Sequence, residues 1–87
     1  MPENYSTQPR PPLSERLSLA NVDHAFTYHP WSEDQAERGR AVTAALIEAA
    51  RTILRNVPEC PTRTRALNNL IDARMLANAA ITHEGRY

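Results

Sequence analysis

The stretch SEDQAERGRAVTAALIEAARTILRNV, from Ser32 to Val57, decides the fold because it has the pattern of one long amphipathic helix. At its start, the Ser32 side chain is placed to accept a hydrogen bond from the amide three residues on, while Gln35 reaches back to the cap. The two acidic residues between them suit the positive end of a helix dipole. Pro58 ends the helix, since proline disfavours a helical residue before it.

The apolar residues of this helix cover an unusually wide arc. At about 100° per residue they fill about 200° of its circumference, and they are Val42, Ala45, Leu46, Ile47, Ala49, Ala50, Ile53, Leu54 and Val57. A single partner helix needs only about half of that arc. The chain has 87 residues, and a chain of this size is marginally stable without staples or partner subunits. We therefore expect a homo-oligomer.

The rest of the chain predicts further helices and no strands. Apolar spacing over Leu13–Phe26 predicts a short helix with Ser14 or Ser18 as its cap, and Thr62 is expected to cap a last helix that runs to about Thr82. The predicted fold is therefore all-α, a short N-terminal helix followed by a long antiparallel helical hairpin.

The domain organisation follows from the prolines. Four of the first twelve residues are proline, which predicts a flexible arm over residues 1–12 and one helical hairpin domain over residues 13–87. The connection around Pro58–Pro61 is only a few residues long, which forces the two long helices to be antiparallel.

A cluster of aromatic residues, Phe26-Thr27-Tyr28-His29-Pro30-Trp31, lies just before the long helix. We interpret Phe26 and Trp31 as staples that hold the short helix on the long one. Tyr28 and His29 have polar ends that require water or a ligand. Rings in an ordered turn beside a helix start form a suitable stacking surface for a nucleobase.

Two polar residues, Arg74 and Asn78, lie four apart on the apolar face of the last helix. A buried polar pair requires partners. We expect Asn78 to make a structural hydrogen bond. For Arg74 two roles stay open, a structural one and an ion pair between subunits or contact with a phosphate.

Several function classes lack support in the sequence. Ten arginines balance ten acidic residues, so the excess positive charge of a general DNA or RNA binder is absent. No apolar run reaches the length of a membrane span. The three histidines, His24, His29 and His83, are scattered along the sequence without a metal-ligand spacing, and Cys60 is the only cysteine, so we expect neither a metal site nor a catalytic set. The chain therefore has the features of a binding protein and not of an enzyme.

Two stretches together resemble a known family. They are Phe26-Thr27-Tyr28-His29-Pro30, followed five positions later by Gln35, and Met75-Leu76-Ala77-Asn78-Ala79-Ala80-Ile81. This order is similar to the hairpin domain shared by phage anti-CBASS cyclic-nucleotide sponges and the C-terminal part of Thoeris anti-defence sponges. The likeness covers about Val22 to His83.

The resemblance implies a small all-α protein that assembles as a hexamer, without a cofactor, in the cytoplasm of an infected bacterial host. Such proteins bind cyclic di- and trinucleotide messengers of CBASS immunity and sequester them without cleavage.

Specific residues carry over from the family with one departure. The resemblance implies that Tyr28 stacks on a base at a subunit interface, beside His29. The family's basic residue on the long helix falls at Thr43, and Arg40, one turn earlier, is the candidate to replace it. A second site at a three-fold axis has His83 and Arg86 as its nearest candidates.

Two alternatives remain open from the sequence. The first is a sponge for an ADP-ribose-type Thoeris signal on the same scaffold, which the departure at Thr43 makes worth testing. The second is a structural or protein-binding helical hairpin in which Arg74 and Asn78 only fix the register of the helices.

Overall fold

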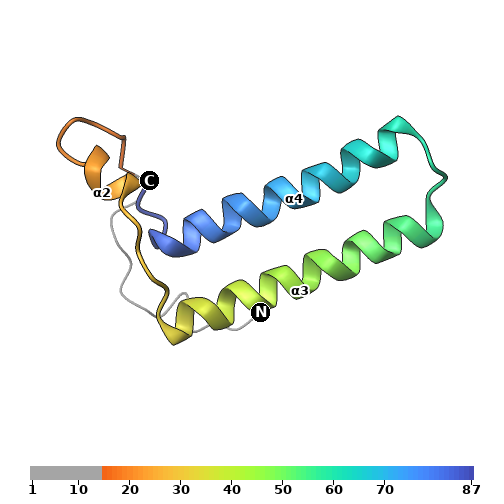
Figure 1. Cartoon of the computed structure of the whole chain (residues 1–87), viewed down its shortest axis with the longest axis horizontal. Helices are drawn as coiled ribbons and strands as arrows, with labels where there is room; N and C mark the ends of the chain where they lie inside the picture. Colours follow the sequence, from red (N-terminus) through yellow and green to blue (C-terminus); the bar gives the residue numbers. More distant parts are fainter. Residues whose placement is uncertain (1–14) are drawn as a thin grey trace.

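The structure is a computed structural model that describes residues 15–87, and these residues form helices and no strand. The elements are α2 (Val22–Phe26), α3 (Glu33–Asn56) and α4 (Pro61–Thr82), as Figure 1 shows. The all-α prediction is confirmed. The predicted arm over residues 1–12, together with Leu13 and Ser14, lies outside the described residues. None of the described helices has the length and apolar character that crossing a membrane requires.

The start of α3 has the predicted capping box. The Ser32 hydroxyl accepts a hydrogen bond from the Gln35 amide at 3.2 Å, and the Ser32 amide donates to Gln35 Oε1 at 3.0 Å. Glu33 and Asp34 occupy the first turn. Val57 caps the other end in an extended conformation, as expected for a residue that precedes proline.

The helix α4 begins two residues earlier than predicted. Cys60 is its N-cap and makes no side-chain cap hydrogen bond, while Pro61 takes the first helical position. The prediction that Thr62 caps this helix is therefore wrong. Proline suits the first position because its fixed φ is helical and its missing amide hydrogen would have no partner there. The helix ends at Thr82, and Gly85 follows with a φ of +76°.

The first described helix is shorter than the range predicted for it. Of the described residues in that range, 15–26, only Val22–Phe26 is helical, and Asn21 rather than Ser18 is its cap. The Asn21 side chain instead accepts from the Ser18 amide at 2.8 Å and donates to the Arg16 carbonyl at 3.0 Å. Asparagine competes for backbone groups in this way, which disfavours a longer helix over residues 15–21.

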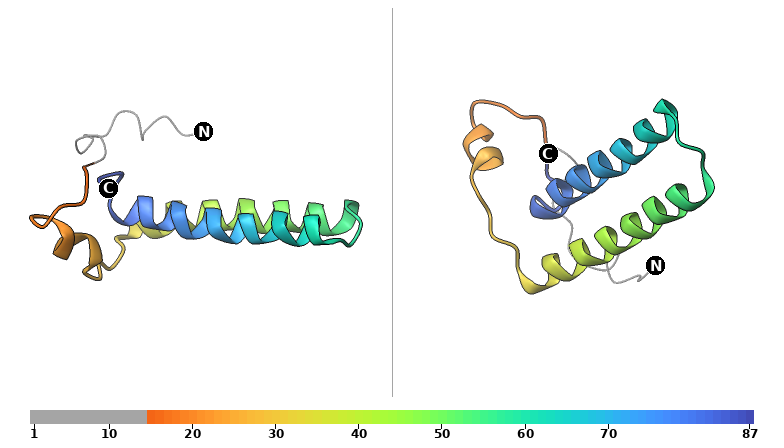
Figure 2. Two further views of the ribbon diagram at one scale, coloured as in Figure 1. Left: turned by 90° about the horizontal axis from the view of Figure 1, so that it is seen from above. Right: turned by 45° about the vertical axis from the view of Figure 1, so that its right-hand side comes forward.

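The two long helices pack side by side and run in opposite directions, joined by residues 57–60 (Figure 1). They form a single layer, which Figure 2 shows edge-on. The Cα radius of gyration is 16.0 Å, whereas a compact chain of this length has a value of about 12 Å. Among the described residues only Gly39 is buried, and no apolar side chain is.

Large apolar side chains remain exposed on both helices of this layer. They include Ile47, Leu54, Ile71, Met75 and Leu76, and the last is 72% exposed. The wide apolar arc predicted for α3 is therefore only partly covered by α4.

Candidate functional site

The indole ring of Trp31 joins the start of α3 to the end of α4. The ring lies against the backbone of Gly39, where a Cβ atom would be only 2.3 Å from Trp31 Cζ3. Its Nε1 donates to Thr82 Oγ1 at 2.7 Å, and Thr82 Oγ1 in turn donates to the Asn78 carbonyl at 2.9 Å. These contacts join α3 to α4, whereas Trp31 was predicted to hold the short helix on the long one. Nothing in the sequence indicated Gly39 as the partner of the ring.

A polar cluster fixes the same two helix ends. Arg38 forms ion pairs with Asp34, at 3.0 Å, and with Glu84. Gln35 Nε2 donates to the Ile81 carbonyl at 2.9 Å and to Glu84 at 3.1 Å. The hydrogen bond from Arg38 holds the pKa of Glu84 below its usual value, against partial burial, with further support from Gln35. Glu84 has a φ of 51°, and these contacts hold it in that unusual conformation.

An open groove of about 500 Å³ lies between α3 and α4 next to Trp31. Its polar residues are Arg40, Thr43, Arg74 and Asn78, the first two from α3 and the others from α4. Within residues 15–87, neither Arg40 nor Arg74 forms an ion pair. Two guanidinium groups thus line one groove without an anionic partner in the part of the chain that the structure describes.

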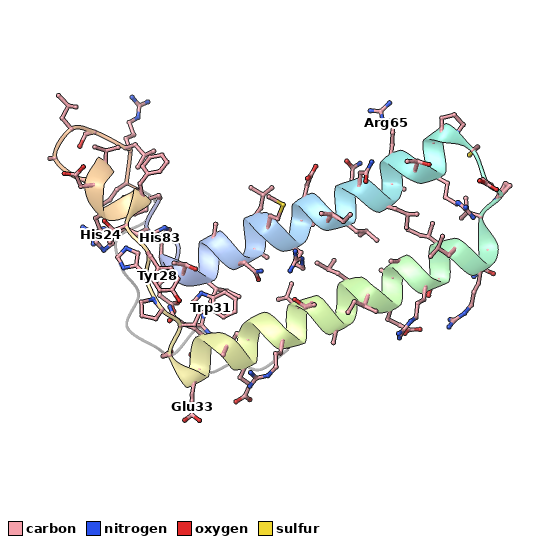
Figure 3. All side chains as sticks on the ribbon, viewed as in Figure 1. His24, Tyr28, Trp31, Glu33, Arg65 and His83 are labelled. Atoms are coloured by element: carbon pink, nitrogen blue, oxygen red, sulfur yellow. The ribbon has the colours of Figure 1, made fainter. Side chains whose placement is uncertain are left out.

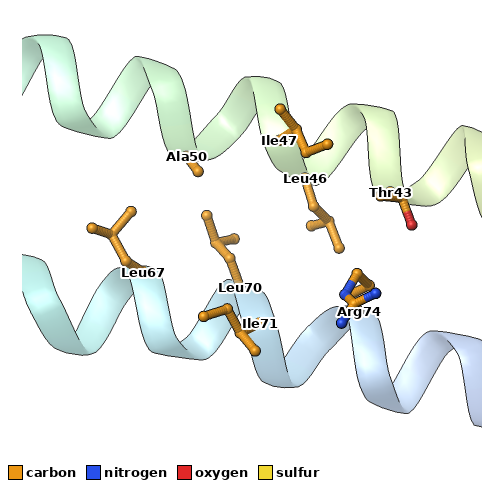
Figure 4. Close-up of a pocket in the computed structure, with 8 residues that line it drawn as sticks. All are labelled: Thr43, Leu46, Ile47, Ala50, Leu67, Leu70, Ile71 and Arg74. Atoms are coloured by element: carbon orange, nitrogen blue, oxygen red, sulfur yellow. The ribbon is translucent and has the colours of Figure 1, made fainter.

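Arg74 and Asn78 do not form the buried polar pair that the sequence predicts. Arg74 is exposed, and Asn78 is half-buried. The Oδ1 atom of Asn78 is itself buried and has no hydrogen-bond partner among the described residues, so the structural bond expected of its side chain is not made there. Figure 4 shows Arg74 beside Thr43 and Leu46, at one end of the apolar space between the helices. Arg74 stays exposed because no third helix of residues 15–87 packs on this face.

A second open groove, of about 440 Å³, is lined by Thr27, Tyr28, His29, Trp31 and Thr82. Tyr28 is 84% exposed, and Figure 3 shows it at the same end of the molecule as Trp31. Trp31 lines both grooves. The predicted stacking residues and the predicted phosphate residues therefore lie in adjoining grooves that share one indole.

Phe26 does not staple α2 to α3 within the chain. Its side chain is 79% exposed, so this part of the prediction is wrong for the single chain. The turn is held instead by hydrogen bonds from Thr27 Oγ1 to the Asp23 carbonyl and from His29 Nε2 to the His24 carbonyl, the latter at 2.8 Å.

The three histidines, scattered in sequence, come together in space. His24 lies on α2, His29 in the following turn and His83 directly after α4. Figure 3 shows His24 and His83 at the same end of the molecule. The ring centroids of His24 and His29 are 4.4 Å apart, and those of His29 and His83 are 5.4 Å apart. Tyr87 closes the group, with its hydroxyl 2.6 Å from His24 Nδ1.

Charged neighbours act on this group of rings. Partial desolvation first, then the positive charges of His29, Arg86 and His83, lower the pKa of His24, while Glu15 opposes them. Arg86 forms an ion pair with Glu15, and this hydrogen-bonded carboxylate raises the pKa of the guanidinium. Of the two residues considered for a second nucleotide site, His83 is thus part of a histidine cluster and Arg86 already has an anionic partner.

No protein-family model matches the chain, and neither the curated proteins nor the solved structures gave a match.

Proposed function

We propose that this chain is a non-enzymatic phage anti-defence protein that binds and sequesters cyclic di- or trinucleotide messengers of bacterial CBASS immunity. The observation that carries the proposal is the groove in which Arg40 and Arg74 lie without an anionic partner among residues 15–87. The resemblance of the two sequence stretches supports the same conclusion.

The two arginines have the right chemistry for a phosphodiester. A guanidinium group donates parallel hydrogen bonds to phosphate oxygens and stays charged at any physiological pH. Thr43 lines the same groove and adds a hydroxyl donor. Arg40 and Arg74 together supply the charge that the family takes from a basic residue at the position of Thr43.

The bases of the ligand require a stacking surface beside this charge. Tyr28 is 84% exposed in the adjoining groove, and Trp31 borders both grooves. Stacking of a base on an aromatic ring contributes about 1–3 kcal/mol. A small ligand with one or a few phosphates suits this arrangement better than a long polyanion, because the chain as a whole has no net charge.

We further propose that the binding unit is a homo-oligomer, with the hexamer that the resemblance implies. The exposed Ile47, Leu54, Ile71 and Leu76 belong to a layer that has no buried apolar side chain among its described residues. Burial of apolar surface is the main stabilising contribution to folding, so this layer gains its stability from copies of itself. Tyr28 at a subunit boundary would then stack on a base held by a neighbouring groove.

The test is a calorimetric titration with cyclic dinucleotides, cyclic trinucleotides and cyclic ADP-ribose isomers, followed by recovery of the ligand and mass spectrometry. Sub-micromolar binding of a cyclic oligonucleotide and its release intact would support the proposal. Binding of an ADP-ribose isomer alone would favour a Thoeris-type sponge, and a cleaved product would identify an enzyme.

One observation favours a second candidate, a structural or protein-binding hairpin. An apolar groove of about 210 Å³ between α3 and α4 is lined by Leu46, Ile47, Leu67, Leu70 and Ile71 (Figure 4). A partner helix of another protein would bury this surface without any nucleotide. Failure of every nucleotide to bind a correctly assembled oligomer would leave this candidate in place.

A further inference from the structure

We infer that His24, His29 and His83 form a binding site for a divalent transition-metal ion of the class that prefers imidazole, with Zn²⁺ as the principal candidate. One ring nitrogen from each of the three side chains lies within 4.8 Å of the other two. The chain has three histidines in total, so all of them belong to this cluster.

The donor set fits this class of metal. Imidazole nitrogen is a ligand for Zn²⁺, Cu²⁺ and Ni²⁺, and three histidines with an open fourth position are a known zinc arrangement. At a zinc–nitrogen bond length of about 2.0–2.1 Å, tetrahedral geometry puts the nitrogens about 3.3 Å apart. The ring nitrogens, which lie within 4.8 Å of one another, therefore need to approach by up to about 1.5 Å. His24 is exposed and lies on the short helix α2, which leaves its ring room to rotate.

The hydrogen bonds of two of the rings match those of metal-bound histidines. His29 Nε2 donates to the His24 carbonyl at 2.8 Å, and His24 Nδ1 bonds the Tyr87 hydroxyl at 2.6 Å. A ligating histidine has one ring nitrogen held by a protein oxygen, which fixes the ring and leaves the other nitrogen for the metal. Both His24 and His29 keep such a nitrogen.

The third ring gives an independent indication. Nδ1 of His83 is buried and has no hydrogen-bond partner among the described residues. A buried polar atom without a partner costs free energy, and such atoms are rare in folded proteins. Coordination of a metal ion would satisfy it.

The charged side chains around the cluster leave it able to accept a cation. Arg86 is the cationic side chain whose charge acts on His24, and the carboxylate of Glu15 is paired with it. Tyr87 lies against the cluster, with its ring 5.0 Å from that of His83 and its hydroxyl on His24 Nδ1, so the fourth position on the ion would be left to water.

The bound ion would clamp the segment before α3 onto the end of α4, because its ligands come from α2, the following turn and the residue after α4. Tyr28 is the neighbour of one ligand, so the metal would also order the turn that carries this ring. The site stands on its own, however, and requires no nucleotide.

The experiment uses the full chain without a histidine tag, stripped of metal with a chelator and then titrated with ZnCl₂ by calorimetry. We expect saturable binding of one zinc ion per chain. The imidazole NMR signals of all three histidines should shift as zinc is added. Substitution His83→Ala breaks no hydrogen bond of the described residues, and it should weaken binding at least about tenfold.

The matched control is Cys60→Ser, which removes the other residue type with high zinc affinity. Cys60 lies at the far end of the hairpin, where α3 and α4 are joined (Figure 1). This variant should bind zinc as the parent does. The inference is overturned if the parent chain shows no saturable binding, if the imidazole signals stay unchanged at saturation, or if His83→Ala binds as tightly as the parent.

Discussion

The indole of Trp31 occupies the space that a side chain on Gly39 would need, since a Cβ there would lie 2.3 Å from Cζ3 and 2.5 Å from Cη2 of the ring. A glycine inside a long helix weakens that helix by about 1 kcal/mol relative to alanine. The presence of glycine at position 39 is therefore explained by the indole ring of Trp31, which also borders both candidate grooves.

Substitution Gly39→Ala should destabilise the protein by about 1–3 kcal/mol, because the displaced indole loses its packing and its hydrogen bond to Thr82. Chemical denaturation at one fixed protein concentration measures the change. The control is the same substitution in a Trp31→Ala background, where the alanine should instead stabilise α3. A stabilising effect in the parent background would show that the ring does not lie on Gly39.

Substitution Glu84→Gln should destabilise the protein by about 1 kcal/mol, a value that allows for solvent screening of a carboxylate that is 42% exposed. Glu48→Gln is the matched control, since Glu48 pairs with Arg51 and Arg55 at 3.6 Å on the exposed face of α3. The loss of stability caused by Glu48→Gln should be close to zero. Equal effects of the two substitutions would contradict the role given to Glu84.

The Glu84 carboxylate should also make the stability of the protein depend on pH. The folded-state pKa of Glu84 lies below its ordinary value of 4.5, so its contribution to stability is fully present above pH 4.5. It should be lost as the pH falls below 4.5 through the lower folded-state pKa. Denaturation of chelator-treated protein between neutral and acidic pH would measure this, and the Glu84→Gln variant should lack that part of the loss.

Substitutions Arg40→Ala and Arg74→Ala should each raise the Kd for a cyclic nucleotide about tenfold or more, since a hydrogen bond to a charged group contributes about 1.5–3 kcal/mol. Arg65→Ala is the control. Arg65 is exposed on α4, and its side chain points away from α3 in Figure 3. Arg65→Ala should leave binding unchanged. An equal loss in all three variants would indicate general attraction by positive charge and no defined site.

Substitution Leu76→Glu should dissociate the proposed oligomer, because a charge cannot be buried in an apolar subunit contact without a partner. Leu76 is 72% exposed in the single chain, so its replacement disturbs no packing inside the hairpin. Light scattering would report the mass. Thr52→Glu, on the exposed face of α3 near Glu48, should leave the mass unchanged. An unaltered mass in the Leu76 variant would exclude this side of α4 from the interface.

The sequence was sufficient to predict the two long helices, because their signals are local. Ser32 and Gln35 specify the start of α3, and Pro58 specifies its end. The predicted start of α4 is wrong because Thr62 has the side chain of a typical cap. In the structure Cys60 is the cap, without a side-chain hydrogen bond, and Pro61 is the first helical residue. Local competition for backbone groups by Asn21, which shortens α2, was the weaker signal that was missed.

The candidate site was predicted only in part because its contacts are between distant residues. Tyr28, His29, Arg40 and Thr43 were singled out individually, but their common neighbour Trp31 emerged from the fold. The histidine cluster joins α2 to the end of α4, so no spacing within one helix could predict it. The exposure of Phe26 on α2 and of Arg74 on α4 likewise depends on which surfaces of these helices are covered by other parts of the chain. The sequence pattern of a single helix does not specify this.

The most direct test of the central claim is a calorimetric titration of the assembled protein with cyclic di- and trinucleotides, with its mass checked by light scattering in the same buffer. We expect an oligomer that binds one of these ligands with a sub-micromolar Kd, which corresponds to more than about 8 kcal/mol, and releases it intact on heating. An oligomer that binds none of them would contradict the account and leave a structural or protein-binding hairpin.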